Sequence, residues 1–127
     1  MPQDTLRRND IDPNGCSSLA LAYIGDAVYE LMIRQKVLSE GNRQVNKLHK
    51  QSSGYVNAKA QAELIESKLE MLTDEEIAVY KRGRNAVSHT VPKNQSVGDY
   101  RKATGFEALV GYLYLSDRVK RIQELFS

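Results

Sequence analysis

Three features of the 127-residue sequence predict an all-α fold. Apolar residues recur at intervals of three and four along most of the chain, which is the spacing of one face of a helix. No segment sustains the alternation of apolar and polar residues that a strand requires, and no Asn-Gly or Asp-Gly hairpin separates β-branched runs. The tetrapeptide at 73–76, Thr-Asp-Glu-Glu, has the form of a capping box, which marks the start of a helix.

The N-terminal third of the chain is expected to contain an arm and one long helix. Residues 1–16 are polar and rich in turn-forming residues, so we expect a flexible N-terminal arm. Ser17 or Ser18 can cap a helix that runs to about Lys36, and Gly41 then interrupts the pattern.

Three further helices are expected between residues 42 and 87. Asn42 is predicted to cap a short helix over 42–51, and the Ser-Ser-Gly sequence at 52–54 then marks a bend. Apolar residues at helical spacing predict the next helix over 55–72. The capping box at Thr73 opens a helix that ends near Val87.

The last third of the chain is expected to hold a loop and two helices. Turn residues and a proline predict a loop or a short helical bend over 88–98. A helix then runs from Asp99 or Tyr100 to about Leu115. The final helix is amphipathic, and its apolar face comprises Val119, Ile122, Leu125 and Phe126.

Length and composition indicate one globular domain in a reducing compartment. A chain of 127 residues is long enough for one hydrophobic core and too short for two. The single cysteine, Cys16, excludes an internal disulfide and a site with several thiols. No apolar run approaches the roughly 20 residues of a membrane-spanning helix, and the N-terminus lacks the apolar core of a signal peptide. We expect a cytoplasmic protein that does not associate with membranes.

Two acidic residues lie in apolar helical segments, each close to a glycine. Asp26 follows Gly25 in AYIGDAVYEL, and Glu107 precedes Gly111 by one turn in TGFEALVGYLYL. Glycine costs about 1 kcal/mol relative to alanine inside a helix, and an unpaired buried carboxylate costs several kcal/mol or loses its charge. Both features are explained if the two helices approach closely at their glycines and bring the acids together.

Adjacent carboxylates repel each other unless a cation lies between them. Oxygen ligands favour a hard ion such as Mg²⁺, which takes one or two carboxylates and completes its shell with water and substrate phosphate. Such a site beside basic surfaces is typical of phosphodiester hydrolysis with a metal-activated water. The pattern leaves a second interpretation open, in which each acid pairs with an arginine or with the N-terminus of a helix.

The net charge of +2 conceals an uneven distribution of charge. Residues 41–62 and 77–98 contain several lysines and arginines but no acid, whereas the segment between them is acidic. The usual interpretation of a charged run is a solvated helix face, but two acid-free basic segments also suit a polyanion. Cations and small polar groups suit the phosphates and 2′-hydroxyls of A-form RNA. The predicted RNA contacts are Lys81, Arg82, Arg84, Asn85, Ser88, Lys93, Arg101 and Lys102, with Arg43, Lys47, Lys50 and His89 as further candidates.

The segments YIGDAVYEL and TGFEALVGYLYL resemble the two signature segments of the ribonuclease III catalytic domain. The length and the block YKRGRNAVSHTVPKNQSVGDYRKATGFEALVGYLYL are similar to the short bacterial branch of that family, Mini-ribonuclease III, which has no double-stranded-RNA-binding domain. The resemblance covers roughly residues 17–126. It implies that residues 17–127 form a dimeric, helical bundle-like endonuclease domain that cleaves double-stranded RNA with Mg²⁺, or with Mn²⁺ in its place.

The resemblance assigns catalytic and metal-binding roles to two residues of this chain. Asp26 falls on the aspartate of the first motif and Glu107 on the glutamate of the second. Only these two of the four usual metal-binding carboxylates are present, so we expect slower or more substrate-restricted cleavage. The other two positions are occupied here by Ala22 and Thr104, and Leu19 occupies a further acidic position of the longer motif.

Three other polar residues near the motifs receive expected roles. The Thr104 hydroxyl can hold a metal-bound water, and Asp99 can contribute an oxygen from the helix entrance. Glu30, four residues after Asp26, is expected to be a structural acid or the partner in a salt bridge.

The resemblance further implies maturation of both ends of 23S ribosomal RNA from its precursor, on a pre-ribosomal particle with help from a ribosomal protein. The products carry a 5′-phosphate and a 3′-hydroxyl. Cutting both strands of a duplex requires a twofold homodimer, because one chain supplies one centre. The apolar residues of the first helix that suit this interface are Leu19, Leu21, Tyr23, Ile24, Val28, Leu31, Met32 and Ile33. Two alternatives are a catalytically silent RNA-binding module and a helical protein-interaction module.

Overall fold

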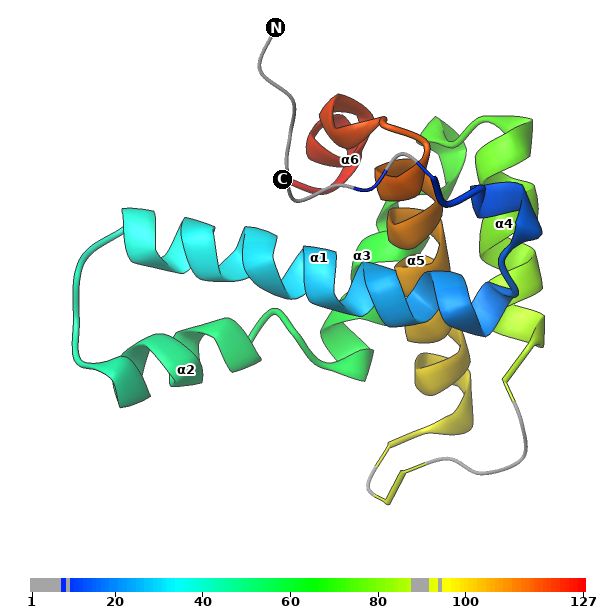
Figure 1. The fold of residues 1–127 in the computed structure, drawn as a ribbon. Coiled ribbons are helices and arrows are strands. Elements are labelled where there is room, and N and C mark those ends of the chain that lie inside the picture. The colour runs from blue at the N-terminus through cyan, green and yellow to red at the C-terminus, as the bar shows by residue number, and fades with distance from the viewer. Residues whose placement is uncertain (1–7, 9, 88–91, 94) are drawn as a thin grey trace, which may run out of the picture.

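The computed structural model describes Arg8, residues 10–87, Pro92, Lys93 and residues 95–127, and these residues form only helices, turns and loops (Figure 1). No strand occurs in this described part, so the all-α prediction is confirmed. The described residues also contain no helix long and apolar enough to cross a membrane. The elements in chain order are η1 (Pro13–Gly15), α1 (Ser18–Ser39), α2 (Val45–Ser53), α3 (Ala58–Lys68), η2 (Leu69–Met71), α4 (Asp74–Asn85), α5 (Val97–Leu115) and α6 (Val119–Phe126).

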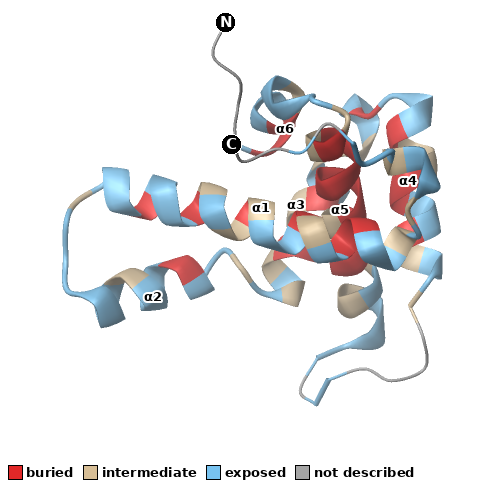
Figure 2. Ribbon diagram, in the orientation of Figure 1, coloured by how far each residue is buried: buried red, intermediate tan, exposed pale blue. Residues whose placement is uncertain are grey.

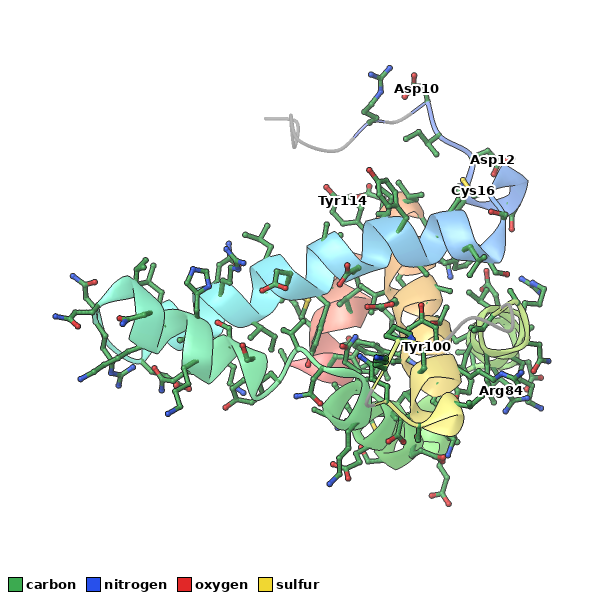
Figure 3. The ribbon with its side chains drawn as sticks, turned by 90° about the horizontal axis from the view of Figure 1, so that it is seen from below. Asp10, Asp12, Cys16, Arg84, Tyr100 and Tyr114 are labelled. Carbon is green, nitrogen blue, oxygen red and sulfur yellow. The ribbon has the colours of Figure 1, made fainter. Side chains whose placement is uncertain are left out.

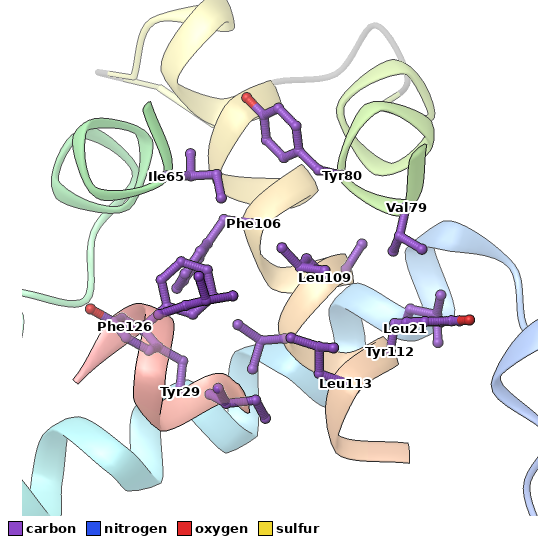
Figure 4. Close-up of a cluster of buried hydrophobic side chains, with 14 of the residues drawn as sticks. Leu21, Tyr29, Ile65, Val79, Tyr80, Phe106, Leu109, Tyr112, Leu113 and Phe126 are labelled. Atoms are coloured by element: carbon purple, nitrogen blue, oxygen red, sulfur yellow. The ribbon is translucent and has the colours of Figure 1, made fainter. Parts of the chain in front are cut away.

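Helix α5 forms the centre of the body because its second half is apolar on every side. Phe106, Leu109 and Leu113 are fully buried, and α1, α3, α4 and α6 surround them (Figure 4). The Phe106 ring packs edge-on against two other rings, with centroids 4.8 Å from Tyr29 and 4.9 Å from Phe126. A helix that is apolar all round is stable only inside a protein, which explains the central position of α5.

The C-terminal half of α1 and helix α2 extend away from this body as a helical hairpin (Figure 1). Buried residues gather on α5 and on the faces turned toward it, whereas α2 is almost entirely exposed (Figure 2). Ser52 is its single buried residue. The hairpin therefore depends on a narrow contact between α1 and α2, not on the main core.

Several helix boundaries differ from the predictions because a different side chain caps the helix. Helix α3 begins at Ala58, since the Asn57 side chain accepts from the N–H of Ala60, and it does not begin at residue 55. Helix α5 begins at Val97, two residues early, because Ser96 caps it.

The prediction that Asn42 caps the second helix is wrong. Helix α2 begins at Val45, and the preceding residue, Gln44, stands at the N-cap position but makes no capping hydrogen bond with its side chain. Smaller differences are that α1 continues to Ser39 and that α4 ends at Asn85. The final helix has the predicted apolar face, except that Val119 is 37% exposed.

The predicted N-terminal arm ends in an ordered turn. Its residues 1–7 and 9 lie outside the described residues. Pro13–Gly15 form η1, which Asp12 caps by accepting from the N–H of Asn14. Cys16 is a free thiol that packs against the core. The segment from Asp12 to Cys16 is thus attached to the body of the domain.

The predicted capping box is present and is part of a larger ion-pair network. The Thr73 hydroxyl accepts from the N–H of Glu76, and the Glu76 carboxylate accepts from the N–H of Thr73. Arg121 of α6 donates to the same carboxylate from Nε and Nη2, each at 2.8 Å. This network joins the start of α4 to α6.

Candidate active site

Helices α1 and α5 cross at two glycines. A Cβ atom on Gly25 would lie 1.7 Å from the carbonyl oxygen of Glu107, and one on Gly111 would lie 2.0 Å from that of Leu21. These distances are shorter than any real contact of a Cβ atom, so the two backbones can touch only without side chains at both positions. The predicted close approach of the two helices is confirmed.

This crossing brings the two acidic residues together. Asp26 directly follows Gly25 on α1, and Glu107 lies one turn before Gly111 on α5. The Asp26 carboxyl lies within hydrogen-bonding reach of the Glu107 carboxyl. Burial, with a further contribution from the neighbouring Asp26, raises the pKa of Glu107 to about 7. The pair is an excess of negative charge that a cation would balance.

A third side chain, which the sequence analysis did not identify, completes the site. Gln61 of α3 is only 4% exposed, and its Nε2 donates to Oε2 of Glu107 at 3.2 Å. This hydrogen bond opposes the rise in the pKa of Glu107. Gln61 lies four residues before the fully buried Ile65, so a polar residue on the apolar face of α3 was the available signal.

The positions of the two missing acids are buried and carry no charge. Ala22 and Thr104 are each 7% exposed, one turn before Asp26 and Glu107 respectively. The Thr104 hydroxyl donates to the carbonyl oxygen of Tyr100 at 2.9 Å. The described residues contain no cluster of three or more histidine, cysteine, aspartate or glutamate side chains that could hold a metal ion.

Asp99, the other additional metal candidate, lies apart from the acid pair. It precedes Glu107 by two turns of α5, which places it about 12 Å away along the helix. It borders a cavity of about 370 Å³ with Lys59, Lys93 and Ser96, near the N-termini of α3 and α5. The donor set at the helix crossing is therefore two carboxylates, which fits an ion such as Mg²⁺ that keeps several water ligands.

The predicted RNA-contact residues fall into two groups at opposite ends of α1. Figure 3 shows side-chain nitrogens around both α2 and α4, with Arg84 labelled on α4. Lys81 and Arg82 on α4 are exposed, whereas the Arg84 guanidinium lies over the Tyr80 ring, 5.7 Å from its centroid. Asn85 at the end of α4, Arg101 on α5 and Lys93, which borders the cavity beside Asp99, are also exposed.

Three of the predicted RNA contacts are either paired with an acid or lie outside the described residues. Lys102 forms an ion pair with Glu66, so its charge is already partly neutralised. Ser88 and His89 lie outside the described residues. The second group, Arg43, Lys47 and Lys50, surrounds a cavity of about 440 Å³ on α2 with Gln51, which accepts from Nη1 of Arg43 at 2.7 Å.

The apolar residues of α1 divide between the core and the surface. Leu21 and Ile33 are buried in the core of the chain itself, so they do not belong to an external interface. Leu19, Tyr23 and Leu31 are 49%, 80% and 52% exposed, and they recur at multiples of four residues. Glu30 on the same helix pairs with Arg34 at 2.9 Å, as predicted for a salt-bridge acid.

Comparison with known proteins places these features in context. The family described as the ribonuclease III domain matches residues 19–118. The chain is 53% identical to Mini-ribonuclease 3 of Enterococcus faecalis, over 87% of this chain and 86% of that protein. It is 48% identical to Mini-ribonuclease 3 of Streptococcus pneumoniae, over 92% and 93% of the two chains. A crystal structure of a protein from Fusobacterium nucleatum is similar with a TM-score of 0.80, at 33% identity and with 87% and 88% coverage.

Proposed function

This chain belongs to the ribonuclease III family, and on that premise we propose that it is an endoribonuclease that cleaves double-stranded RNA during the processing of ribosomal RNA. The observation that carries the proposal is the Asp26 and Glu107 pair at the glycine crossing, because both residues lie on the segments that resemble the family signatures. The products are expected to carry a 5′-phosphate and a 3′-hydroxyl, as the family implies.

Asp26 and Glu107 are the proposed ligands for Mg²⁺, or for Mn²⁺ in its place. When bound, the ion supplies activation of water and neutralisation of charge on the scissile phosphate. The chain fixes the backbone positions of the two acids, since each lies on a core helix beside the contact between the two backbones. Burial is the main cause of the raised pKa of Glu107, and a divalent cation would offset both this burial and the repulsion from Asp26.

The basic residues around α4 are proposed to bind the RNA backbone. Lys81, Arg82 and Arg101 are exposed and suit phosphate contacts, so binding should weaken steeply as the salt concentration rises. The α2 group would contact the duplex at the other end of α1. The remaining proposed contacts are Arg84, Asn85, Ser88, Lys93, Lys102 and His89.

A homodimer is proposed because a duplex presents two strands and the chain supplies one pair of acids. Leu19, Tyr23 and Leu31 form an apolar surface on α1 that a second copy can cover. The proposed substrate is the precursor of 23S ribosomal RNA, cut at both ends in the cytoplasm, on a pre-ribosomal particle that includes a ribosomal protein.

The proposal is tested by comparing the wild-type chain with Asp26→Asn and Glu107→Gln. Each protein is incubated with long duplex RNA in Mg²⁺ and in chelator. We expect cleavage only by the wild type and only in Mg²⁺, with all three proteins binding the RNA. Cleavage that survives both substitutions would overturn the proposed site. Salt-sensitive binding without any cleavage would indicate a silent RNA-binding module, and no binding would indicate a protein-interaction module.

A further inference from the structure

Gln61 reaches the acid pair from a third helix that carries none of the family signature residues. It lies 46 residues before Glu107 in the chain, yet its side chain is almost fully buried and donates to the Glu107 carboxylate. Only the amide nitrogen of a glutamine can donate to a carboxylate oxygen, so this contact determines the orientation of the amide. Gln61 therefore contacts the carboxylate group of Glu107 and not only its methylene groups.

Packing alone does not explain a glutamine at this position. The neighbouring residues on this face of α3, Ala62 and Ile65, are 2% and 0% exposed, so an apolar side chain would suit the surroundings. A buried amide costs free energy unless it is hydrogen-bonded. The hydrogen bond to Glu107 offsets the cost of burying the Gln61 amide, so the role of Gln61 is to be sought in that bond.

The chemistry of the amide suits an acid that must stay able to bind a cation. A lysine or arginine at this position would neutralise Glu107 and compete with the metal ion. A carboxylate would add a third negative charge to the repulsion between Asp26 and Glu107. An amide donates a hydrogen bond and adds no net charge.

The hydrogen bond also selects one orientation of the carboxylate. The terminal torsion of a glutamate is broad, so an unheld carboxylate samples many orientations. Gln61 holds Oε2 of Glu107 from α3, and because one amide donor occupies only one lone pair of a carboxylate, the other lone pairs stay available to a cation. Partners that hold a metal ligand in this way typically contribute 10- to 100-fold to metal affinity or activity.

We propose that Gln61 is a positioning residue, which holds the carboxylate of Glu107 in the orientation that binds the divalent cation. The inference rests on the proposed function, since it assumes that Asp26 and Glu107 are metal ligands. It adds a third helix, α3, to the set of elements that determine the geometry of the site.

The test uses the full chain and measures Mn²⁺ binding by calorimetry in the absence of RNA. Gln61→Leu removes the donor and keeps a similar volume, and Gln61→Met does so with an unbranched side chain. We expect both variants to bind Mn²⁺ about 10- to 100-fold more weakly than wild type. Thermal melting and duplex RNA affinity in chelator should match those of wild type. Gln35→Leu, on the exposed face of α1, is the matched control and should change none of these values.

The outcomes separate this inference from the proposed function. If wild type binds Mn²⁺, Glu107→Gln loses it and folded Gln61→Leu keeps wild-type affinity, the role of Gln61 is refuted and the metal site stands. If both Gln61 variants fail to fold, or lose RNA affinity in the same proportion, Gln61 is a structural residue and the inference is wrong. If wild type binds no Mn²⁺, or Glu107→Gln binds it normally, the proposed metal site fails and the inference fails with it.

Discussion

Glu76 and Glu107 are two glutamates in apolar parts of the same helical body, and their surroundings shift their pKa values in opposite directions. Glu76 accepts from the N–H of Thr73 and from two nitrogens of Arg121, and the Arg121 hydrogen bonds are the main reason that its pKa is lowered. Glu107 accepts from the amide of Gln61 and faces a second carboxyl, Asp26, while burial raises its pKa.

The difference distinguishes a structural acid from a proposed functional one. The chain itself supplies a cation to Glu76, so the cost of burying its charge is offset by an ion pair that links α4 to α6. At Glu107 the chain supplies a neutral donor and a second carboxyl, and the proposed function assigns the balancing positive charge to a cation from solution. A buried acid that the protein leaves short of positive partners is therefore a better indicator of a metal site than burial alone.

The largest expected effect is on activity, in which substitutions of the two glutamates should differ most. Glu107→Gln removes one of two proposed protein ligands, and we expect the initial rate on duplex RNA to fall about 1,000-fold, or about 4 kcal/mol. Glu76→Gln should leave the rate per folded molecule within about threefold of wild type, because it lies outside the site. Equal losses of rate in the two variants would remove the functional distinction between the two acids.

The crossing of α1 and α5 is expected to be the next most sensitive feature. Gly25→Ala places a methyl group into the backbone of Glu107, so the helices must separate and the acids must move. We expect the free energy of unfolding, measured with urea, to fall by more than about 3 kcal/mol, the upper end of ordinary overpacking. Gly98→Ala on the same α5 is the control, since its Cβ would meet nothing within 4 Å. A Gly25→Ala protein with wild-type stability would contradict the observed contact.

Removing Arg121, the positively charged partner of Glu76, should leave Glu76 without a positive partner, as Glu107 is in the described structure. Arg121→Met leaves a carboxylate that is 3% exposed without its charged partner. We expect a loss of about 3 kcal/mol in the free energy of unfolding, at the low end for a buried pair because Arg121 is partly exposed. The exposed pair of Glu30 with Arg34 provides the contrast, and Arg34→Met should cost at most about 0.5 kcal/mol. Similar losses in the two variants would show that burial of the carboxylate is not the cause.

The smallest expected effect is the dependence of stability on pH in chelator. Because the folded pKa of Glu107 is raised from 4.5 to about 7, the folded protein retains a proton that the unfolded chain loses across this window. The free energy of unfolding should therefore decrease between about pH 5 and pH 7.5, by about 1–2 kcal/mol relative to Glu107→Gln. Glu76 has a lowered pKa, so its contribution is present above the unfolded pKa and is lost as the pH falls through the folded pKa.

Urea unfolding of both proteins at pH 5, 6 and 7.5 in chelator measures this difference. Calorimetry in two buffers with different ionisation enthalpies should also detect release of a proton when Mn²⁺ binds near pH 6.5. Parallel pH profiles for the wild type and Glu107→Gln would show that Glu107 is not protonated in this range.

The sequence by itself determined the all-α class, the capping box at Thr73 and the pairing of Asp26 with Glu107. These features depend on local hydrogen bonding and helical periodicity, or on glycines that have few other uses inside a helix. Some helix starts were predicted incorrectly: α3 begins only after its cap Asn57, and α2 begins at Val45 without a side-chain cap although Asn42 is able to cap. The presence of a residue able to cap therefore does not by itself determine where a helix begins.

The tertiary structure alone decided which partners the buried acids have. Arg121 and Gln61 lie 45 and 46 residues from the glutamates that they contact, and no local pattern encodes such distances. The same applies to Leu21 and Leu19, two similar residues of one helix of which only the second is exposed. A charge is stabilised or left unbalanced by groups that packing brings together. For this reason the structure distinguishes a structural glutamate from a proposed metal ligand.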